Sequence, residues 1–150
     1  VLYSVSGPVP EEEYLVPLGQ AEIKKEGTDV TLISYSLMLN KTLGVAEQLA
    51  ADGINAEVID LRTLSPLDHD TLARSVQKTH KAVVIQEAVE VGGVAAQVVK
   101  SLVDSSFEYL DAPIKTVAAC NTVIPFSPPL EDAMLPNEEK ILAAAKEVLG

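Results

Sequence analysis

The chain has 150 residues, of which 47% are apolar and 22% charged, a composition typical of one globular domain with a hydrophobic core of its own. Its 22 acidic and 11 basic residues give a net charge of −11. This excess argues against nucleic acid as a partner, because phosphate binding needs clustered lysine and arginine, and it suits either a basic protein partner or plain solubility.

Cysteine content and hydropathy narrow the setting. The single cysteine rules out an internal disulfide and favours a reducing compartment, a bacterial cytoplasm or an organellar matrix or stroma. We expect Cys120 to be a small buried apolar side chain. No apolar run approaches the ~18 residues of a membrane helix, so no membrane association is predicted. Because the chain opens on Val1 rather than methionine, we expect a fragment of something longer or a processed product.

The first part of the chain differs in composition from the rest. Residues 1–19, VLYSVSGPVPEEEYLVPLG, hold three prolines, two glycines and three consecutive glutamates, a pattern that predicts an extended lead-in. Apolar and polar residues then alternate over 20–25, which predicts a short edge strand. We therefore divide the chain into a lead-in with an edge strand, 1–28, and a domain, 29–150.

From residue 29 the pattern alternates between β-branched apolar runs and stretches with helical spacing. A strand–helix alternation of this kind predicts a mainly parallel sheet with helices on both faces. The predicted fold is an α/β three-layer sandwich with a five-stranded sheet, in which one edge strand is free to run antiparallel. The strands are expected at 29–36, 54–61, 81–88 and 113–120, the helices at 37–53, 69–79, 92–107 and 137–150, and a proline-rich loop at 121–137.

Glycines follow the third of these strands, where α/β proteins often bind a ligand. Gly92 and Gly93 are adjacent, however, and neither a P-loop nor a dinucleotide fingerprint is present. We therefore favour a tight turn that lets the next helix pack closely on the sheet over a phosphate cradle. His69 and His80 lie at helix ends without a cysteine or serine partner nearby in the sequence, so we interpret both as exposed and structural. No catalytic, cofactor-binding or metal-binding residue is predicted in this chain.

Charged side chains gather at the predicted strand ends. Asp60 and Arg62 lie two positions apart, so they point to one side of their strand. Arg62 is placed to form a bidentate ion pair with a carboxylate such as Glu87, which follows Gln86 at the end of another strand. The residues alone leave two interpretations open, a structural ion pair at the sheet edge and the border of an interface or active site.

These segments carry a resemblance to a known family. The segments EVIDLRTLSPLD (57–68), KAVVIQEA (81–88), YLDAP (109–113) and NTVIPF (121–126) follow one another in the same order as in that family. The chain resembles the carboxyl-terminal domain of the beta subunits of 2-oxo acid dehydrogenase decarboxylating components, of the pyruvate dehydrogenase type, within the wider transketolase-like family. The resemblance covers nearly the whole chain, from about residue 14 to its end.

The resemblance implies a role in a larger enzyme. It implies a subunit of an α2β2 tetramer that decarboxylates a 2-oxo acid, with pyruvate favoured, and reductively acylates lipoamide. Thiamine diphosphate and Mg²⁺ would be bound mainly outside this chain, by an amino-terminal domain and by the alpha subunit, and none tightly here. The isolated domain would be inactive. The implied partners are the alpha subunit, a second beta subunit and the basic subunit-binding domain of the dihydrolipoyl acyltransferase.

The same resemblance assigns roles to individual residues. Asp111 matches an acidic docking position for the acyltransferase, and the chain end at Gly150 lies near that surface in relatives. Asp60, Arg62, Gln86, Glu87, Gly92 and Gly93 are interpreted as interface or structural residues. Asn121 stands where many relatives have aspartate, which removes one charge from that loop.

Two alternatives accompany this interpretation. One is the last domain of a transketolase or a 1-deoxyxylulose-5-phosphate synthase, which shares the fold. The other, from a different class, is a freestanding acidic interaction module. The YLDAP segment and the NTVIPF loop favour the dehydrogenase, and the linker-like start argues against the freestanding module.

Overall fold

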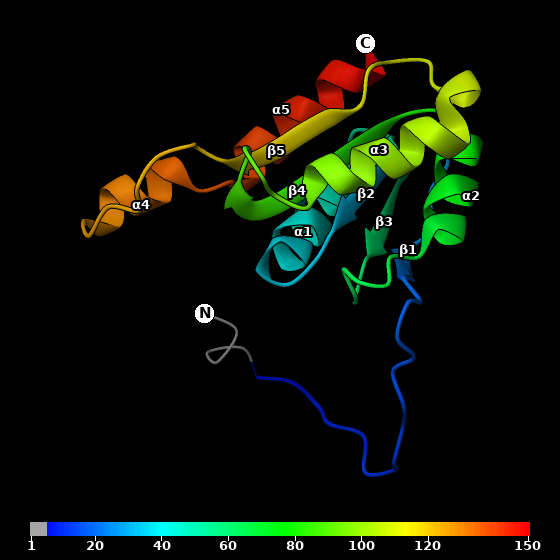
Figure 1. Ribbon diagram of the computed structural model, residues 1–150, viewed down its shortest axis with the longest axis horizontal. Coiled ribbons are helices and arrows are strands. Elements are labelled where there is room, and N and C mark those ends of the chain that lie inside the picture. The colour runs from blue at the N-terminus through cyan, green and yellow to red at the C-terminus, as the bar shows by residue number, and fades with distance from the viewer. Residues whose placement is uncertain (1–5) are drawn as a thin grey trace.

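A computed structural model describes residues 6–150 (Figure 1). The predicted lead-in therefore falls partly outside it, since residues 1–5 are not described. The strands are β1 (Glu22–Lys25), β2 (Val30–Ser34), β3 (Ala56–Asp60), β4 (Ala82–Val89) and β5 (Lys115–Ala119). The helices are α1 (Leu37–Ala51), α2 (His69–Thr79), α3 (Ala95–Ser106), α4 (Pro128–Met134) and α5 (Glu138–Leu149), with a short 3-10 turn, η2 (Phe107–Tyr109), after α3.

The five strands form one sheet in the order β1-β3-β2-β4-β5. Parallel pairs join β3, β2, β4 and β5, whereas β1 runs antiparallel to β3 at the edge. The predicted fold class is confirmed, including the antiparallel edge strand. Because β2, β3 and β4 are parallel, their carboxyl ends lie together at one end of the sheet and their amino ends lie together at the other end.

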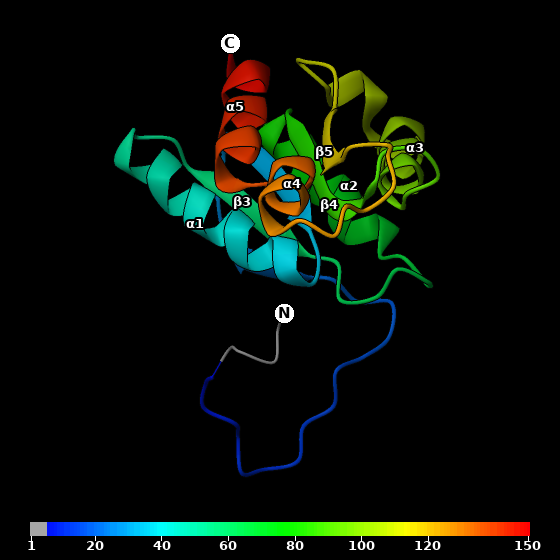
Figure 2. The same cartoon turned by 90° about the vertical axis from the view of Figure 1, so that its left-hand side faces the viewer.

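Each face of the sheet is covered by helices, which gives two hydrophobic cores (Figures 1 and 2). Alternate residues of a strand point to opposite faces, so Leu32 joins one core while Ile33 joins the other. One core is closed by α1 and α5, around Leu49 and Ile141, and the other by α2 and α3. The central strands β2, β3 and β4 are mostly apolar because both of their faces are buried.

Two sequence expectations are corrected here. The region 121–137 was expected to be a loop, but it contains α4, whose Pro128 and Pro129 occupy the first helical positions. Proline is tolerated there because the first amides of a helix have no partner within it. Cys120 was expected to be buried and is exposed, since it lies just beyond the end of β5.

The lead-in leaves the domain as an extended segment. Residues 6–18 are exposed along their whole length, and Figure 1 shows them running away from the sheet. Within residues 6–150, no helix combines the length and apolarity that crossing a membrane requires.

Candidate functional site

The predicted site residues fall into two groups, one at the carboxyl ends of the strands and one at their amino ends. Asp60, Arg62, Gln86 and Glu87 lie where strands β3 and β4 approach or pass their carboxyl ends. Asp111 lies before β5, among the amino ends of the strands. The geometry therefore brings the first set to one side of the molecule and separates it from the predicted docking residue.

Gln86 anchors the turn between β4 and α3. Its side chain is fully buried, its amide nitrogen donates to the carbonyl of Val89 (3.0 Å), and its amide oxygen accepts from the backbone N–H of Ala95 (2.7 Å). Ala95 is the first residue of α3, whose first amides have no partner within the helix. Gln86 thus satisfies a buried donor at the helix start.

The two glycines of this turn serve it differently. A Cβ on Gly93 would lie 2.1 Å from the amide nitrogen of Gln86 and 2.6 Å from the carbonyl oxygen of Val89. Gly92 has open space around it but a φ of +78°, a conformation that side-chain-bearing residues rarely adopt. Gln86 fills the space next to Gly93 and accepts from the first amide of α3, so that amide is already bonded within the protein.

Arg62 does not pair with Glu87, and that expectation is wrong. Its guanidinium binds Glu22 on β1, while its backbone N–H donates to the carboxylate of Asp60 (3.0 Å). The reason is the strand order: β1 neighbours β3, whereas β2 stands between β3 and β4. Arg62 itself has a φ of +54°, which ends the strand alternation on which the expectation rested.

Glu87 instead lies near Tyr35, just past the end of the neighbouring strand β2. Burial raises the pKa of the Tyr35 hydroxyl, and the negative charge of Glu87 raises it further. The next residue, Ser36, has a φ of 55° before α1 begins, a strained conformation for a residue with a side chain. Beside it, the hydroxyl of Ser34 is buried and has no hydrogen-bond partner. The carboxyl ends of β2 and β4 therefore carry polar side chains and one strained residue. Of these residues, the sequence pattern had indicated only Glu87.

The predicted docking residues lie at the other end of the sheet, near the amino ends of the strands. Asp111 is exposed, and its backbone N–H donates to the carbonyl of His80 (2.9 Å). The Nδ1 atom of His80 lies 2.7 Å from the carbonyl oxygen of Tyr109, and the two rings stack. In both views the segment before β5 passes beside the end of α5, where Gly150 lies (Figures 1 and 2). Asp111 and the chain end therefore share one side of the molecule, with two exposed aromatic rings of η2, Phe107 and Tyr109, nearby in the chain.

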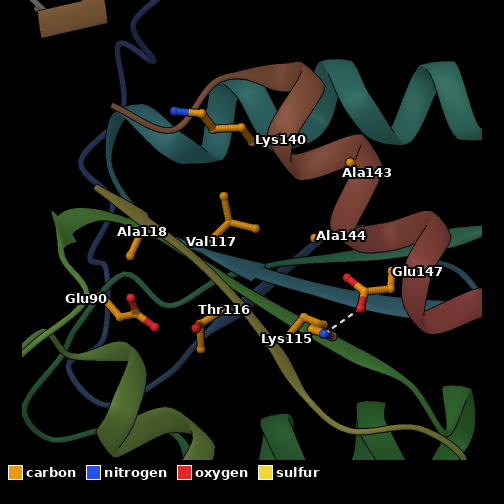
Figure 3. A pocket seen from close by; sticks show the side chains of 9 residues that line it. All are labelled: Glu90, Lys115, Thr116, Val117, Ala118, Lys140, Ala143, Ala144 and Glu147. Atoms are coloured by element: carbon orange, nitrogen blue, oxygen red, sulfur yellow. Dashed lines mark ion pairs between the residues drawn. The ribbon is translucent and has the colours of Figure 1, made fainter. Parts of the chain in front are cut away.

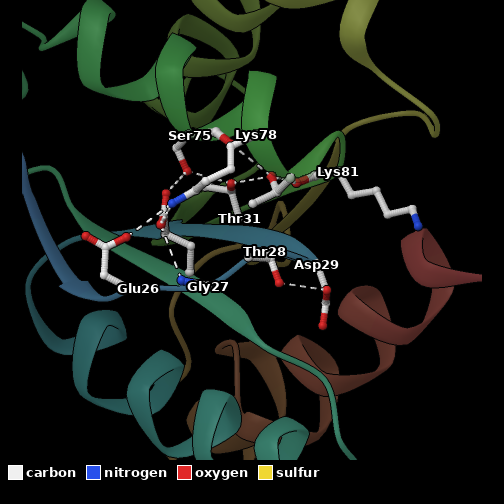
Figure 4. A network of polar contacts seen from close by, with 10 residues as sticks. Glu26, Gly27, Thr28, Asp29, Thr31, Ser75, Lys78 and Lys81 are labelled. Atoms are coloured by element: carbon white, nitrogen blue, oxygen red, sulfur yellow. Dashed lines mark hydrogen bonds and ion pairs between the residues drawn. The ribbon is translucent and has the colours of Figure 1, made fainter.

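A buried ionic network, absent from the sequence predictions, lies between β3 and α2 (Figure 4). The carboxylate of Glu57 is fully buried and accepts from Lys78, from the hydroxyl of Ser75 and from the N–H of Gly27 (3.3 Å). Burial alone would raise the pKa of Glu57, but the hydrogen bonds from Lys78 and Ser75 hold it below its usual value. The signal in the sequence was a charged residue inside an otherwise apolar strand.

Two further features of residues 6–150, a surface hollow and a histidine–serine pair, contain none of the predicted site residues. A hollow of about 430 Å³ lies between the edge strand β5 and α5, bordered by an ion pair between Lys115 and Glu147 (2.6 Å) (Figure 3). On the other face of the sheet, the Nδ1 atom of His69 lies 2.6 Å from the hydroxyl of Ser101. Ser101 is 7% exposed and sits inside α3, so no backbone amide is free beside it to stabilise an oxyanion.

Residues 19–141 match the family model for the transketolase, C-terminal domain. The chain belongs to this family. It is 50% identical over 141 residues to the pyruvate dehydrogenase E1 component subunit beta of Bacillus subtilis, an alignment that covers 94% of this chain and 43% of the relative. It is 45% identical over 148 residues to the acetoin:2,6-dichlorophenolindophenol oxidoreductase subunit beta of the same organism, covering 99% and 43%.

A solved structure supports the same assignment. An inactive β4 tetramer of a split-gene transketolase superposes with a TM-score of 0.80 at 26% identity, over 95% of this chain and 45% of the other. The transketolase C-terminal domain described here thus spans less than half the length of the curated relatives it matches.

Proposed function

We propose that this transketolase C-terminal domain serves the beta subunit of a thiamine diphosphate-dependent 2-oxo acid dehydrogenase, with pyruvate as the favoured substrate. The observation that carries the proposal is the 50% identity over 94% of the chain to a pyruvate dehydrogenase E1 beta subunit. The domain's own contribution is assembly and docking. The parent enzyme decarboxylates the 2-oxo acid and transfers the acyl group to lipoamide.

In this proposal thiamine diphosphate and Mg²⁺ are held mainly outside the chain. The turn at Gly93 supports this division, because Gln86 already takes the first amide of α3 and fills the space beside the glycine. The alpha subunit and a second beta subunit complete an α2β2 assembly in a reducing compartment. The polar strand ends at Tyr35 and Glu87 then form part of the border that the domain presents to its neighbours.

The docking part of the proposal rests on the end of the sheet where the strands have their amino ends. Asp111 is exposed there, and the protein carries a net charge of −11, which favours a basic partner domain by electrostatic steering. The partner proposed is the subunit-binding domain of the dihydrolipoyl acyltransferase.

A chimeric subunit tests the proposed function. The chain replaces the matching 43% of the Bacillus subtilis pyruvate dehydrogenase beta subunit, and the chimera is expressed with the corresponding alpha subunit. We expect assembly and pyruvate decarboxylation with thiamine diphosphate and Mg²⁺, measured with an artificial electron acceptor. The isolated 150 residues should show no turnover under the same conditions.

A matched chimera distinguishes the second candidate. The acetoin-oxidising relative is 45% identical over 99% of the chain, so the same replacement is made in its beta subunit and assayed with acetoin. Activity restored in the acetoin enzyme alone would contradict the pyruvate assignment. Failure of both chimeras to assemble with an alpha subunit would contradict the dehydrogenase proposal as a whole and favour a transketolase-type parent.

A further inference from the structure

The loop between β3 and α2, residues 61–68, holds the segment 19–22 through three polar contacts. The N–H of Gly19 donates to the hydroxyl oxygen of Thr63 (2.9 Å), and the N–H of Ala21 donates to a carboxylate oxygen of Asp68 (2.9 Å). The third contact is the ion pair of Arg62 with Glu22. We call residues 61–68 the clamp loop and residues 19–22 the entry segment.

Bonds inside the clamp loop orient its two acceptors. The hydroxyl of Thr63 donates its proton to the carbonyl of Pro66 (3.0 Å), which leaves its oxygen free to accept from the entry segment. The second carboxylate oxygen of Asp68 accepts from the N–H of Thr71 (3.0 Å) and caps α2. One carboxylate therefore serves a helix start and the entry segment together.

The entry segment also fits closely against the clamp loop. Gly19 has a φ of +73°, and a Cβ on it would lie 2.9 Å from Cγ of Pro66. Glycine thus allows both the turn and the close approach at this position. A surface recess beside the contact is lined by the entry segment and the start of α2, including Gln20, Asp70 and Arg74.

The clamp marks the boundary between two kinds of chain. Residues 6–18 are exposed along their length and extend away from the domain (Figure 1), whereas residues from Gly19 onward are bonded to it. Because the chain turns at Gly19, the contacts there set the direction in which residues 6–18 leave. In the curated relatives more than half of the subunit lies outside the matched part, so this direction bears on how such parts are placed.

We propose that the clamp loop fixes the direction in which the chain enters this domain, and that the carboxylate of Asp68 and the hydroxyl oxygen of Thr63 are the two groups that hold the backbone of the entry segment. The charged groups that face Asp68 are Arg74 and Asp70, both on α2. From the entry segment, the backbone N–H of Ala21 donates to it and the neutral Gln20 lines the same recess, whereas the carboxylate of Glu22 pairs with Arg62.

Electrostatics agree with this geometry. Burial would raise the pKa of Asp68, but the backbone N–H groups of Thr71 and Ala21 hold it below its ordinary value. A depressed carboxyl pKa means that the stability contributed by the carboxylate is fully present above the ordinary value and is lost as the pH falls through the depressed one. The contact between Ala21 and Asp68 therefore contributes fully at neutral pH and weakens in acid.

Amide hydrogen exchange in the 150-residue protein tests the proposal at neutral pH. Asp68→Ser keeps a good helix cap for Thr71 but provides no second oxygen for Ala21. We expect the amide of Ala21 to exchange about tenfold faster, the usual effect of losing a hydrogen bond to a charged group, while amides of β4 stay protected. Asp70→Asn, which changes the neighbouring carboxylate, should leave Ala21 unchanged.

A second variant separates direction from local bonding. Thr63→Val removes the contact to Gly19, together with the bond to Pro66, at nearly the same side-chain shape, and it is combined with Asp68→Ser. In the double variant we expect the ¹⁵N–¹H heteronuclear NOE values of residues 19–21 to fall to those of residues 11–16, while Glu22 stays paired in β1. Unchanged exchange at Ala21 in Asp68→Ser, or unchanged NOE values in a double variant whose β4 amides remain protected, would overturn the clamp.

Discussion

Contacts between individual atoms determine which side chains fit in the turn after β4. Gln86 fills the space next to Gly93, and its amide fixes both the carbonyl of Val89 and the first amide of α3. Adjacent glycines in a sequence do not reveal this difference, because one is needed for its backbone angles and the other for its missing Cβ. The sequence predicted a tight turn, but it did not identify Gln86 as the side chain that packs against Gly93.

Gly93→Ala should destabilise the protein more than Gly92→Ala. The new Cβ at position 93 would displace the Gln86 amide and press on a backbone carbonyl, so we expect a loss of about 3 kcal/mol of unfolding free energy. At position 92 only the positive φ is strained, which costs about 1 kcal/mol. Urea unfolding of both variants measures the difference. Equal losses would show that the Gln86 contact contributes nothing.

Some helices and strands are linked by polar side chains that local sequence patterns do not predict. Period and turn residues located the strands β2 to β5 and the helices α1, α2, α3 and α5, because both faces of the sheet are buried and the helices are amphipathic. The same reasoning missed α4, since its first two helical residues are prolines in a proline-rich stretch. It also missed the buried Glu57, whose partners lie on elements distant in the sequence.

Lys78→Met should destabilise the protein in a pH-dependent way. Without the ammonium group, burial is expected to raise the pKa of Glu57 above its ordinary value instead of leaving it depressed. A raised carboxyl pKa favours folding in acid, so the loss relative to wild type should be about 1–3 kcal/mol at neutral pH and shrink toward pH ~4. This range is smaller than for a fully buried pair, because the Lys78 side chain is 41% exposed.

Chemical denaturation across that pH range provides the measurement. Lys100→Met is the matched control, because Lys100 pairs with Asp104 on the surface of α3 and such pairs contribute about 0.5 kcal/mol or less. A Lys78→Met loss that is constant with pH would show that Glu57 does not titrate as this network requires.

Strand order limits what can be inferred about the molecule as a whole. The alternation of strands and helices predicts a parallel sheet, but the neighbours of each strand follow from long-range packing. Arg62 was expected to meet Glu87 because both end a strand, yet β2 separates their strands and Glu22 on β1 takes the contact. The two predicted site groups lie at opposite ends of the strands, one at the carboxyl ends and one at the amino ends. This separation suits a domain that contacts different neighbours on each side.

Asp111→Lys in the active chimeric subunit should weaken binding of the acyltransferase subunit-binding domain at least about tenfold at low salt, with a smaller loss at high salt. The substitution leaves a cation facing a basic partner, whereas the rest of the acidic surface stays in place. Glu131→Lys is the matched control, because it makes the same change of charge on α4, at the other end of the molecule from Gly150 (Figure 1). Calorimetric titration of both variants separates local docking from general attraction. Equal weakening by the two substitutions would mean that only net charge acts, and wild-type affinity of Asp111→Lys at both salt concentrations would remove Asp111 from the docking surface.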